Sequence, residues 1–309
     1  MSIIFSQKVI ENAEHMVHII SQPTFDVNTT DDCEQTALHI AAQMGYHRVI
    51  KLLIQKEADP NKFDICGRTP IYIAAGNGHV KVVQMLASYG ANVNFRRKGG
   101  KTPLVKAVSR GHIQTVKVLL ACGADIEKSD NCYHTPIHMA VDRSQSDILQ
   151  LLIMHGAKVN TIDLFGKTPF YKAVENGQEN TALLLLDHGA DINSCRHVTP
   201  LYYAANDEDL PMVSFLVANN CDVDTPLMRA KNNGNKAVVK IIENALQKQE
   251  YYRLISLQML LRPLRLPVLV LYTIYNIFHT FHLKYTVPRH KAWSICSAIK
   301  KVDEGGGAS

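Results

Sequence analysis

The sequence predicts an all-α repeat solenoid with a helical C-terminal extension. One pattern recurs seven times, and each copy contains two short helical segments separated by a turn. A unit of that size cannot bury its own apolar face, so neighbouring copies must stack. Across 309 residues, 46% are hydrophobic and 20% are charged, which is ordinary for a folded protein and excludes general disorder.

The repeat is visible as a Thr start followed by an apolar helical pattern. Five copies begin 33 residues apart, and two degenerate copies follow after steps of 31 and 26 residues. Such self-similarity is the signature of a repeat architecture. The seven starts are Thr36, Thr69, Thr102, Thr135, Thr168, Thr199 and Thr225.

Each part of the repeat has a local physical reason. The Thr is a helix N-cap, and the Pro that follows it in most copies suits the first helical position. Small residues such as Ala74 and Ala75 let this first helix approach its neighbour closely. A glycine such as Gly78 then turns the chain into a second helix, which ends at a glycine such as Gly90. An extended segment leads to a polar, projecting loop before the next Thr.

Several copies depart from this glycine pattern. Ser144 and Glu208 replace the glycine between helices, and Glu57 replaces the glycine that ends the second helix. If the left-handed backbone is kept there, each substitution costs on the order of 1 kcal/mol. Asn220 occupies the same stop position, where Asn is tolerated.

The projecting loop also shortens along the chain. It spans eight positions from Asn160 to Thr168, six from Asn193 to Thr199, and is missing before Thr225. We therefore expect the loop-borne binding surface to fade after the fifth repeat.

Four segments are predicted from this organisation. A helical face over residues 5–20, formed by Val9, Ala13, Met16, Val17 and Ile20, predicts an N-terminal capping half-repeat over residues 1–28. Residues 29–246 hold the repeats, residues 247–301 form a helical cap or partner-binding tail, and residues 302–309 are expected to be disordered. The repeat units begin near residues 31, 64, 97, 130, 163, 195 and 224.

The C-terminal extension carries most of the net positive charge. From Lys248 onward there are nine Lys/Arg and three Asp/Glu, a balance of +6 against +5 for the whole chain. A continuous helix is predicted from Ala237 to the Arg262-Pro263 step. A second, amphipathic helix is predicted over residues 264–283, and a short third one around residues 293–300. The apolar face of the second helix includes Leu271, Ile274, Phe278 and Phe281.

This amphipathic helix has three interpretations. It packs on the last repeat as a cap, it docks on a partner helix or groove, or it contacts a membrane surface, which the flanking Arg and Lys favour. Arg265, Pro267, Asn276, His279 and His282 interrupt it, which disfavours a transmembrane span.

The repeat resembles the ankyrin repeat. Residues 64–94 follow the pattern DxxGxTPLHxAAxxGHxxxVxxLLxxGADVN closely, and the resemblance covers residues 28–245. It implies helix-turn-helix units joined by β-hairpin turns, and a non-catalytic scaffold or adaptor that binds a protein on the concave face of the first five repeats. Fold does not identify the partner, because variable surface residues do so.

One surface constellation suggests an acidic or phosphorylated partner. The residue before the Thr cap is basic or His in four consecutive repeats, 33 positions apart, and further cations and two aromatic residues flank these positions. The predicted partner-binding residues are Arg68, Arg96, Arg97, Lys98, Lys101, Arg110, Tyr133, His134, Arg143, Phe165 and Lys167.

Further roles stay open. The stretch SLQMLLRPLRLP resembles the C-terminal box by which some ankyrin proteins recruit ubiquitin-ligase subunits, and a leucine-proline start before an apolar helix is also F-box-like. The chain is also compatible with a membrane-associated ankyrin protein and with a bacterial effector acting in a host cell. Asn193, in an Asp-Ile-Asn segment after a leucine-rich helix, resembles the ankyrin asparagines that are hydroxylated.

No motif for enzymatic chemistry is recognisable. Gly100-Lys101-Thr102 and Gly166-Lys167-Thr168 imitate the end of a P-loop but lack its first glycine. The seven cysteines form no CxxC pair, and no Cys/His block has zinc-ligand spacing. We therefore expect a cytoplasmic protein with free thiols, no metal, no cofactor, no catalytic site and no nucleic-acid partner.

Overall fold

A computed structural model of the chain describes residues 12–195 and 198–261. Within these residues the protein is built from α-helices and loops, and the sole β-type pairing is an isolated bridge between Thr30 and Thr36. The all-α prediction is confirmed. The chain divides into two compact units, Met1–Ile241 and Ile242–Ser309, and the repeats belong to the first.

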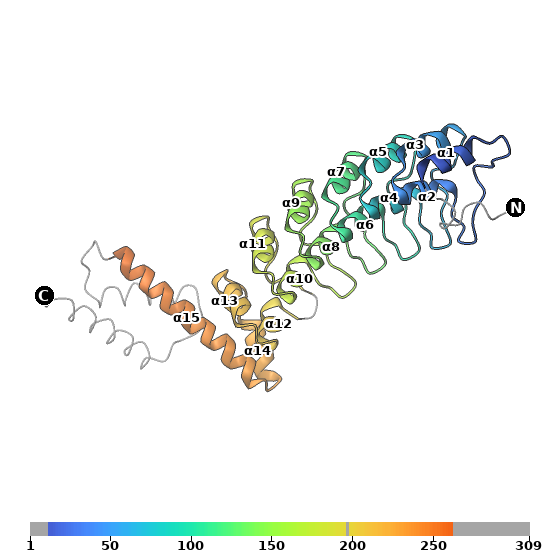
Figure 1. The fold of residues 1–309 in the computed structure, drawn as a ribbon. Coiled ribbons are helices and arrows are strands. Elements are labelled where there is room, and N and C mark those ends of the chain that lie inside the picture. The colour runs from blue at the N-terminus through green and yellow to red at the C-terminus, as the bar shows by residue number, and fades with distance from the viewer. Residues whose placement is uncertain (1–11, 196–197, 262–309) are drawn as a thin grey trace. The chain divides into compact units, whose positions relative to one another are not determined.

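The repeats form two rows of helices in the first unit (Figure 1). Each first helix packs against the first helix of the next repeat, and the second helices from α3 to α9 follow the same order. The first helices are α2 (Ala37–Met44), α4 (Pro70–Asn77), α6 (Pro103–Arg110), α8 (Pro136–Asp142), α10 (Pro169–Glu175), α12 (Pro200–Asn206) and α14 (Asp224–Asn232). The second helices are α3 (His47–Gln55), α5 (Val80–Ser88), α7 (Ile113–Ala121), α9 (Ser146–Met154), α11 (Glu179–Asp187), α13 (Leu210–Ala218) and α15 (Lys236–Leu261).

The N-terminal helix α1 (Ala13–Ser21) extends the row of second helices by packing against α3. The Asn12 side chain caps α1 by accepting a hydrogen bond from the His15 backbone N–H, and Met16 and Ile20 are buried. A helical face was predicted over residues 5–20, and in the structure α1 begins at Ala13 with Asn12 as its N-cap. Residues 5–11, Val9 among them, lie outside the described part of the chain.

Threonine occupies the N-cap position of the first six first helices, as predicted, although the Thr69 hydroxyl makes no capping hydrogen bond. Thr36, Thr69, Thr102, Thr135, Thr168 and Thr199 all occupy the N-cap position with extended backbone, and from Thr69 onward Pro follows.

The prediction that Thr225 caps the seventh first helix is wrong. Helix α14 begins one residue earlier, at Asp224, so Thr225 lies inside its first turn. No projecting loop precedes this repeat, and the Asp222 carboxylate serves the helix start instead. It accepts hydrogen bonds from the Asp224 backbone N–H at 3.0 Å and from the Thr225 hydroxyl at 2.6 Å.

The left-handed backbone is kept where glycine is replaced. Ser144 has φ 53°, Glu208 has φ 59° and Glu57 has φ 64°, and Asn220 has φ 60°. The expected strain is therefore present at these turns.

Asparagine side chains join consecutive repeats along the extended segments. The Asn94 amide donates to the Gly123 carbonyl at 3.0 Å, while its oxygen accepts from the Asp125 backbone N–H at 2.7 Å. Asn61 and Asn160 make the same pair of bonds to their next repeats. Asn193 belongs to this series, since its oxygen accepts from the Asp222 N–H at 2.8 Å. We call these contacts the asparagine clamps.

The C-terminal helix α15 runs without interruption from Lys236 to Leu261. The predicted continuous helix ending at the Arg262-Pro263 step is thus confirmed over its described length. The predicted helices over residues 264–283 and 293–300, with Leu271, Ile274, Phe278 and Phe281, lie outside the described residues. Within the described residues, no helix is long and apolar enough to cross a membrane.

Candidate functional site

The projecting loops, called fingers here, present equivalent residues in the same way. Finger 1 is residues 29–35, and fingers 2 to 5 are residues 62–68, 95–101, 128–134 and 161–167. Each finger is closed by a backbone N–H that donates to the carbonyl four residues later, for example Asp64 to Arg68 at 3.0 Å and Asp163 to Lys167 at 3.0 Å. Adjacent fingers are also bonded, since the Ile65 N–H donates to the Cys33 carbonyl at 3.0 Å. The residues predicted before each Thr cap therefore occupy equivalent places.

An aspartate stiffens most fingers from within. In finger 2, the Asp64 Oδ1 accepts hydrogen bonds from the backbone N–H groups of Cys66 and Arg68, at 3.0 and 2.8 Å. Asp31, Asp130 and Asp163 make the same two bonds in fingers 1, 4 and 5. This short Asx-type turn fixes the backbone that leads to the residue before the Thr cap. We call the four such residues that were predicted to bind a partner, Arg68, Lys101, His134 and Lys167, the ladder residues.

Finger 3 differs because Arg97 stands where the other fingers have aspartate. The Arg97 guanidinium lies over the ring of Tyr72, 5.7 Å from its centroid, in a cation–π contact. Arg96 donates to the Gly100 carbonyl at 3.1 Å, and the Lys98 ammonium donates to the Ile65 carbonyl at 2.9 Å. Two of the predicted binding cations, Arg96 and Lys98, thus also bond to finger backbone.

A cluster of cations surrounds Lys106 on α6. Burial lowers the pKa of Lys106 first, and repulsion from four neighbouring cations lowers it further. Its aliphatic chain lies beside Gly76 of α4, where a Cβ would come within 2.7 Å of the Lys106 Cε. The cationic cluster consists of Arg68, Arg97, Lys101, Lys106 and Arg110.

Few carboxylates offset this charge. Arg68 forms an ion pair with Asp64 at 2.6 Å, whereas Arg97, Lys101, Lys106 and Arg110 form none with any residue of the described chain. Residues 62–110 contain nine Lys/Arg and one Asp/Glu. Cations that lie close enough to lower the pKa of Lys106 produce a positive local potential, which attracts anionic groups.

The structure thus brings four predicted residues together and adds one that the sequence did not indicate. Lys106 was missed because it lies within a helix, at the position held by Ile73 and Met139 in neighbouring repeats. The excess of basic residues over 62–110 was a usable signal for it.

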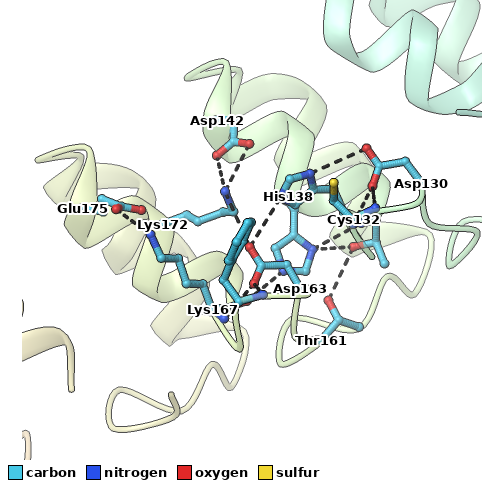
Figure 2. Close-up of polar contacts among 12 residues, drawn as sticks. Asp130, Cys132, His138, Asp142, Thr161, Asp163, Lys167, Lys172 and Glu175 are labelled. Atoms are coloured by element: carbon cyan, nitrogen blue, oxygen red, sulfur yellow. Dashed lines mark hydrogen bonds and ion pairs between the residues drawn. The ribbon is translucent and has the colours of Figure 1, made fainter. Parts of the chain in front are cut away.

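The same ladder positions in fingers 4 and 5 have acidic neighbours (Figure 2). The Lys167 ammonium pairs with Glu175 at 2.6 Å, and Lys172 pairs with Asp142 at 3.0 Å. The His134 ring lies between two carboxylates, with Nδ1 3.6 Å from Asp130 and Nε2 3.4 Å from Asp163. Within the described chain, Lys101 therefore has no carboxylate partner, whereas Arg68 pairs with Asp64, and His134 and Lys167 also lie beside carboxylates.

Aromatic and aliphatic side chains lie exposed on the fingers. The predicted contacts Tyr133 and Phe165 have 58% and 61% of their surface exposed. Phe63, Ile65, Ile162 and Leu164 are about half exposed as well, and sequence analysis did not select them. Phe63 stacks on Phe95 of the next finger, with ring centroids 6.1 Å apart. We call these exposed residues the fingertip residues.

Two predicted cations lie at helix ends. Arg110 is in the last turn of α6, and Arg143 follows α8 at its C-cap, where it is exposed. Of these two, Arg110 contributes to the lowered pKa of Lys106. Arg143 lies one repeat further on, beside the acidic Asp142.

Comparison with known families agrees with this architecture. A family model described as "Ankyrin repeats (3 copies)" matches residues 6–97, 58–130 and 104–196. The single "Ankyrin repeat" model matches residues 196–224. The chain belongs to the ankyrin repeat family. No curated protein matches it.

Membership of the ankyrin family gives the chain a general role. Ankyrin repeats form protein–protein interaction scaffolds and are generally non-catalytic. The fold alone does not identify the partner of an ankyrin array.

Proposed function

We propose that this ankyrin protein is a non-catalytic scaffold or adaptor that holds an acidic protein segment on repeats 1–5. The observation that carries this proposal is the cationic cluster, in which four of five cations lack a carboxylate partner within the described chain. Carboxylates or phosphates of a partner would relieve the repulsion around Lys106, and the fingertip residues would supply apolar contact area.

The test is affinity capture with the full-length protein, followed by mass spectrometry. The site variant carries Lys101→Glu, Lys106→Glu and Arg110→Glu. The control carries the same change of charge at exposed lysines of the second helices, through Lys51→Glu, Lys81→Glu and Lys117→Glu. We expect the chief partner to be lost from the site variant alone.

Salt provides an independent measurement on the same partner. The Debye length falls to about 3 Å at 1 M salt. Binding of an acidic partner by the cationic cluster should therefore weaken steeply as the salt concentration rises. A chief partner that stays bound to the site variant, or whose affinity does not change with salt, would contradict the acidic-segment proposal. It would leave the general scaffold role unaffected.

A second contact through the C-terminal segment rests on the sequence alone. Contact with a membrane surface requires the apolar face of residues 264–283, and so does the F-box-like form of ubiquitin-ligase recruitment. The ligase-box resemblance lies mainly before that helix, in the stretch SLQMLLRPLRLP. Changing Leu271, Ile274, Phe278 and Phe281 to Ser should abolish capture of a ligase subunit, or flotation with anionic vesicles, if either role is correct. A bacterial effector role is decided by the source of the chain.

A further inference from the structure

Finger 4 gathers three possible metal ligands in one closed turn. One ligand atom each from Asp130, Cys132 and His134 lie within 4.8 Å of one another. Figure 2 shows Asp130 and Cys132 beside each other, with the Asp163 carboxylate nearby.

The backbone of the finger holds this arrangement in place. The Asp130 Oδ1 accepts hydrogen bonds from the N–H groups of Cys132 and His134, at 2.9 and 3.0 Å. Its other oxygen, Oδ2, is left facing His134 Nδ1 at 3.6 Å. Ligand atoms bound about 2.0–2.3 Å from a tetrahedral Zn²⁺ are separated by a similar distance.

A buried carboxylate stands on the far side of the His134 ring. Asp163 is 4% exposed, and its Oδ2 accepts no hydrogen bond from the described chain. His134 Nε2 is likewise buried without a hydrogen-bond partner there, and the two atoms lie 3.4 Å apart. A metal-bound histidine characteristically donates its second N–H to such a carboxylate.

The charged side chains around the turn carry an excess of negative charge, which favours a divalent cation. Asp130, Asp142, Asp163 and Glu175 contribute four negative charges, while Lys167 and Lys172 contribute two positive charges. With a neutral His134, the group carries a net charge of about −2.

We propose that Asp130 Oδ2, Cys132 Sγ and His134 Nδ1 bind a zinc-type divalent cation. The Cys132 thiol loses its proton to solvent on binding, and the neutral His134 ring coordinates through Nδ1 while its Nε2–H donates to Asp163. Thiolate and imidazole ligands favour zinc over magnesium or calcium, and water fills the fourth position. The site is independent of the acidic-partner proposal.

The other fingers show why only the fourth would bind metal among the five. Finger 2 has Asp64 and Cys66 in the same places, but Arg68 replaces the histidine and occupies the Asp64 Oδ2 at 2.6 Å. Finger 1 has Gln35 at that position, and finger 5 has Phe165 in place of the cysteine. The absence of paired cysteines had predicted no metal, whereas the alternating Asp-x-Cys-x-His of finger 4 is the sequence signal for this site.

Cobalt(II) tests the site because it substitutes for zinc and reports thiolate ligation by a charge-transfer absorption band. The full-length protein, kept reduced, is titrated with CoCl₂ and then with ZnCl₂. We expect the band to reach its maximum at one equivalent of Co²⁺ and to disappear as Zn²⁺ displaces it. Cys132→Ser should remove the band, and the matched Cys66→Ser should retain it.

Two more variants separate the roles of the ring and of the buried carboxylate. His134→Gln should abolish binding at this site while leaving the helical circular dichroism unchanged. Asp163→Asn keeps the side-chain oxygen that accepts from the Phe165 and Lys167 N–H groups, and should weaken zinc affinity by roughly 10–100-fold without losing the band. Absence of the band in the unmodified protein would overturn the proposal. So would a band that persists in both Cys132→Ser and His134→Gln, because the metal would then sit elsewhere.

Discussion

Tyr133 combines an exposed aromatic side chain with a left-handed backbone. Its φ of 58° is left-handed, and Gly67, Gly100 and Gly166 take the equivalent position in other fingers. The sequence pattern revealed the strained Ser144, Glu208 and Glu57 because they interrupt helix-turn glycines. It did not reveal Tyr133, or Glu34 with φ 59° at the equivalent place in finger 1, since finger residues vary too widely for such exceptions to be noticed. A strained, exposed aromatic residue is consistent with a role in contact.

Replacing Tyr133 should therefore stabilise the protein. We expect Tyr133→Gly to raise the free energy of unfolding by about 1 kcal/mol, because glycine adopts the left-handed region without strain. Urea unfolding followed by circular dichroism measures the change. Gly123→Ala is the opposite control: its φ is 84° and an added Cβ would meet nothing within 4 Å, so only backbone strain is introduced. A Tyr133→Gly protein no more stable than the parent would show that the strain is negligible.

Two buried histidines make stability depend on pH. Nδ1 of His138 accepts from the Thr135 N–H at 3.3 Å, and its Nε2 donates to the Lys167 carbonyl at 3.2 Å; His39 makes the equivalent bonds to Thr36 and Arg68. Both bonds require a neutral ring with its proton on Nε2. Burial lowers the pKa of His39, and lowers that of His138 from 6.5 to about 4.

The sign of the pH effect follows from those directions. Below pH 6.5 these histidines are protonated in the unfolded chain but stay neutral in the folded protein. The free energy of unfolding therefore falls as the pH drops from about 6.5 to about 4. For His138 the loss should approach about 3 kcal/mol. Denaturation of the parent and of His138→Gln across this range measures it. An unchanged pH dependence in His138→Gln would show that this residue is not responsible.

Among the elements, the helices were predictable and the contacts between repeats were not. The signals that begin and end each helix act within a few residues. They are the Thr caps, the proline at the first helical position and the glycine stops, and they allow the helices to be predicted from the sequence. Thr225 failed as a cap because the Asp222 carboxylate competes for the same helix start. The pairing of Lys172 with Asp142 joins residues 30 positions apart, and only the stacking of α8 and α10 places them together.

The asparagine clamps give an element-scale prediction at a position where the asparagine is replaced. Glu127 takes the place of the clamp asparagine between repeats 3 and 4, where its carboxylate accepts from the Lys158 N–H at 2.8 Å. A carboxylate cannot also donate to the Gly156 carbonyl, as Asn61 donates to Gly90. We expect Glu127→Asn to stabilise the protein by about 1 kcal/mol.

Thermal unfolding of Glu127→Asn measures that gain. Glu127→Gln is the matched control, because it removes the charge but has a side chain one methylene longer than asparagine. Equal stabilisation by both substitutions would mean that the charge, and not the clamp geometry, limits this junction.

At the scale of the whole array, stability should vary along the chain. Fingers 1 to 5 are closed and several are bonded to their neighbours, whereas the loop before the sixth repeat is shorter and the seventh repeat has none. In a linear stack, each repeat depends on its nearest neighbours, so the end with fewer bonds should open first.

Equivalent leucines in different repeats test this gradient. Leu119 on α7 and Leu216 on α13 are both fully buried, so changing either to alanine should cost about 2–5 kcal/mol locally. Hydrogen exchange should show Leu216→Ala losing protection in repeats 6 and 7 only. Leu119→Ala should lower protection on both sides of repeat 3. A uniform loss of protection in both proteins would indicate one cooperative unit instead.

Finger 3 retains its closing bond, from the Arg97 N–H to the Lys101 carbonyl at 3.2 Å, although arginine has replaced the aspartate that stiffens the other fingers. The loop therefore folds without depending on any one side chain at that place. Substitutions in a finger can replace an acidic residue by a basic one, or a glutamine by a histidine, without changing the helices that flank the loop. An array of this kind can acquire a new ligand one loop at a time, so its recognition properties can diverge faster than its architecture.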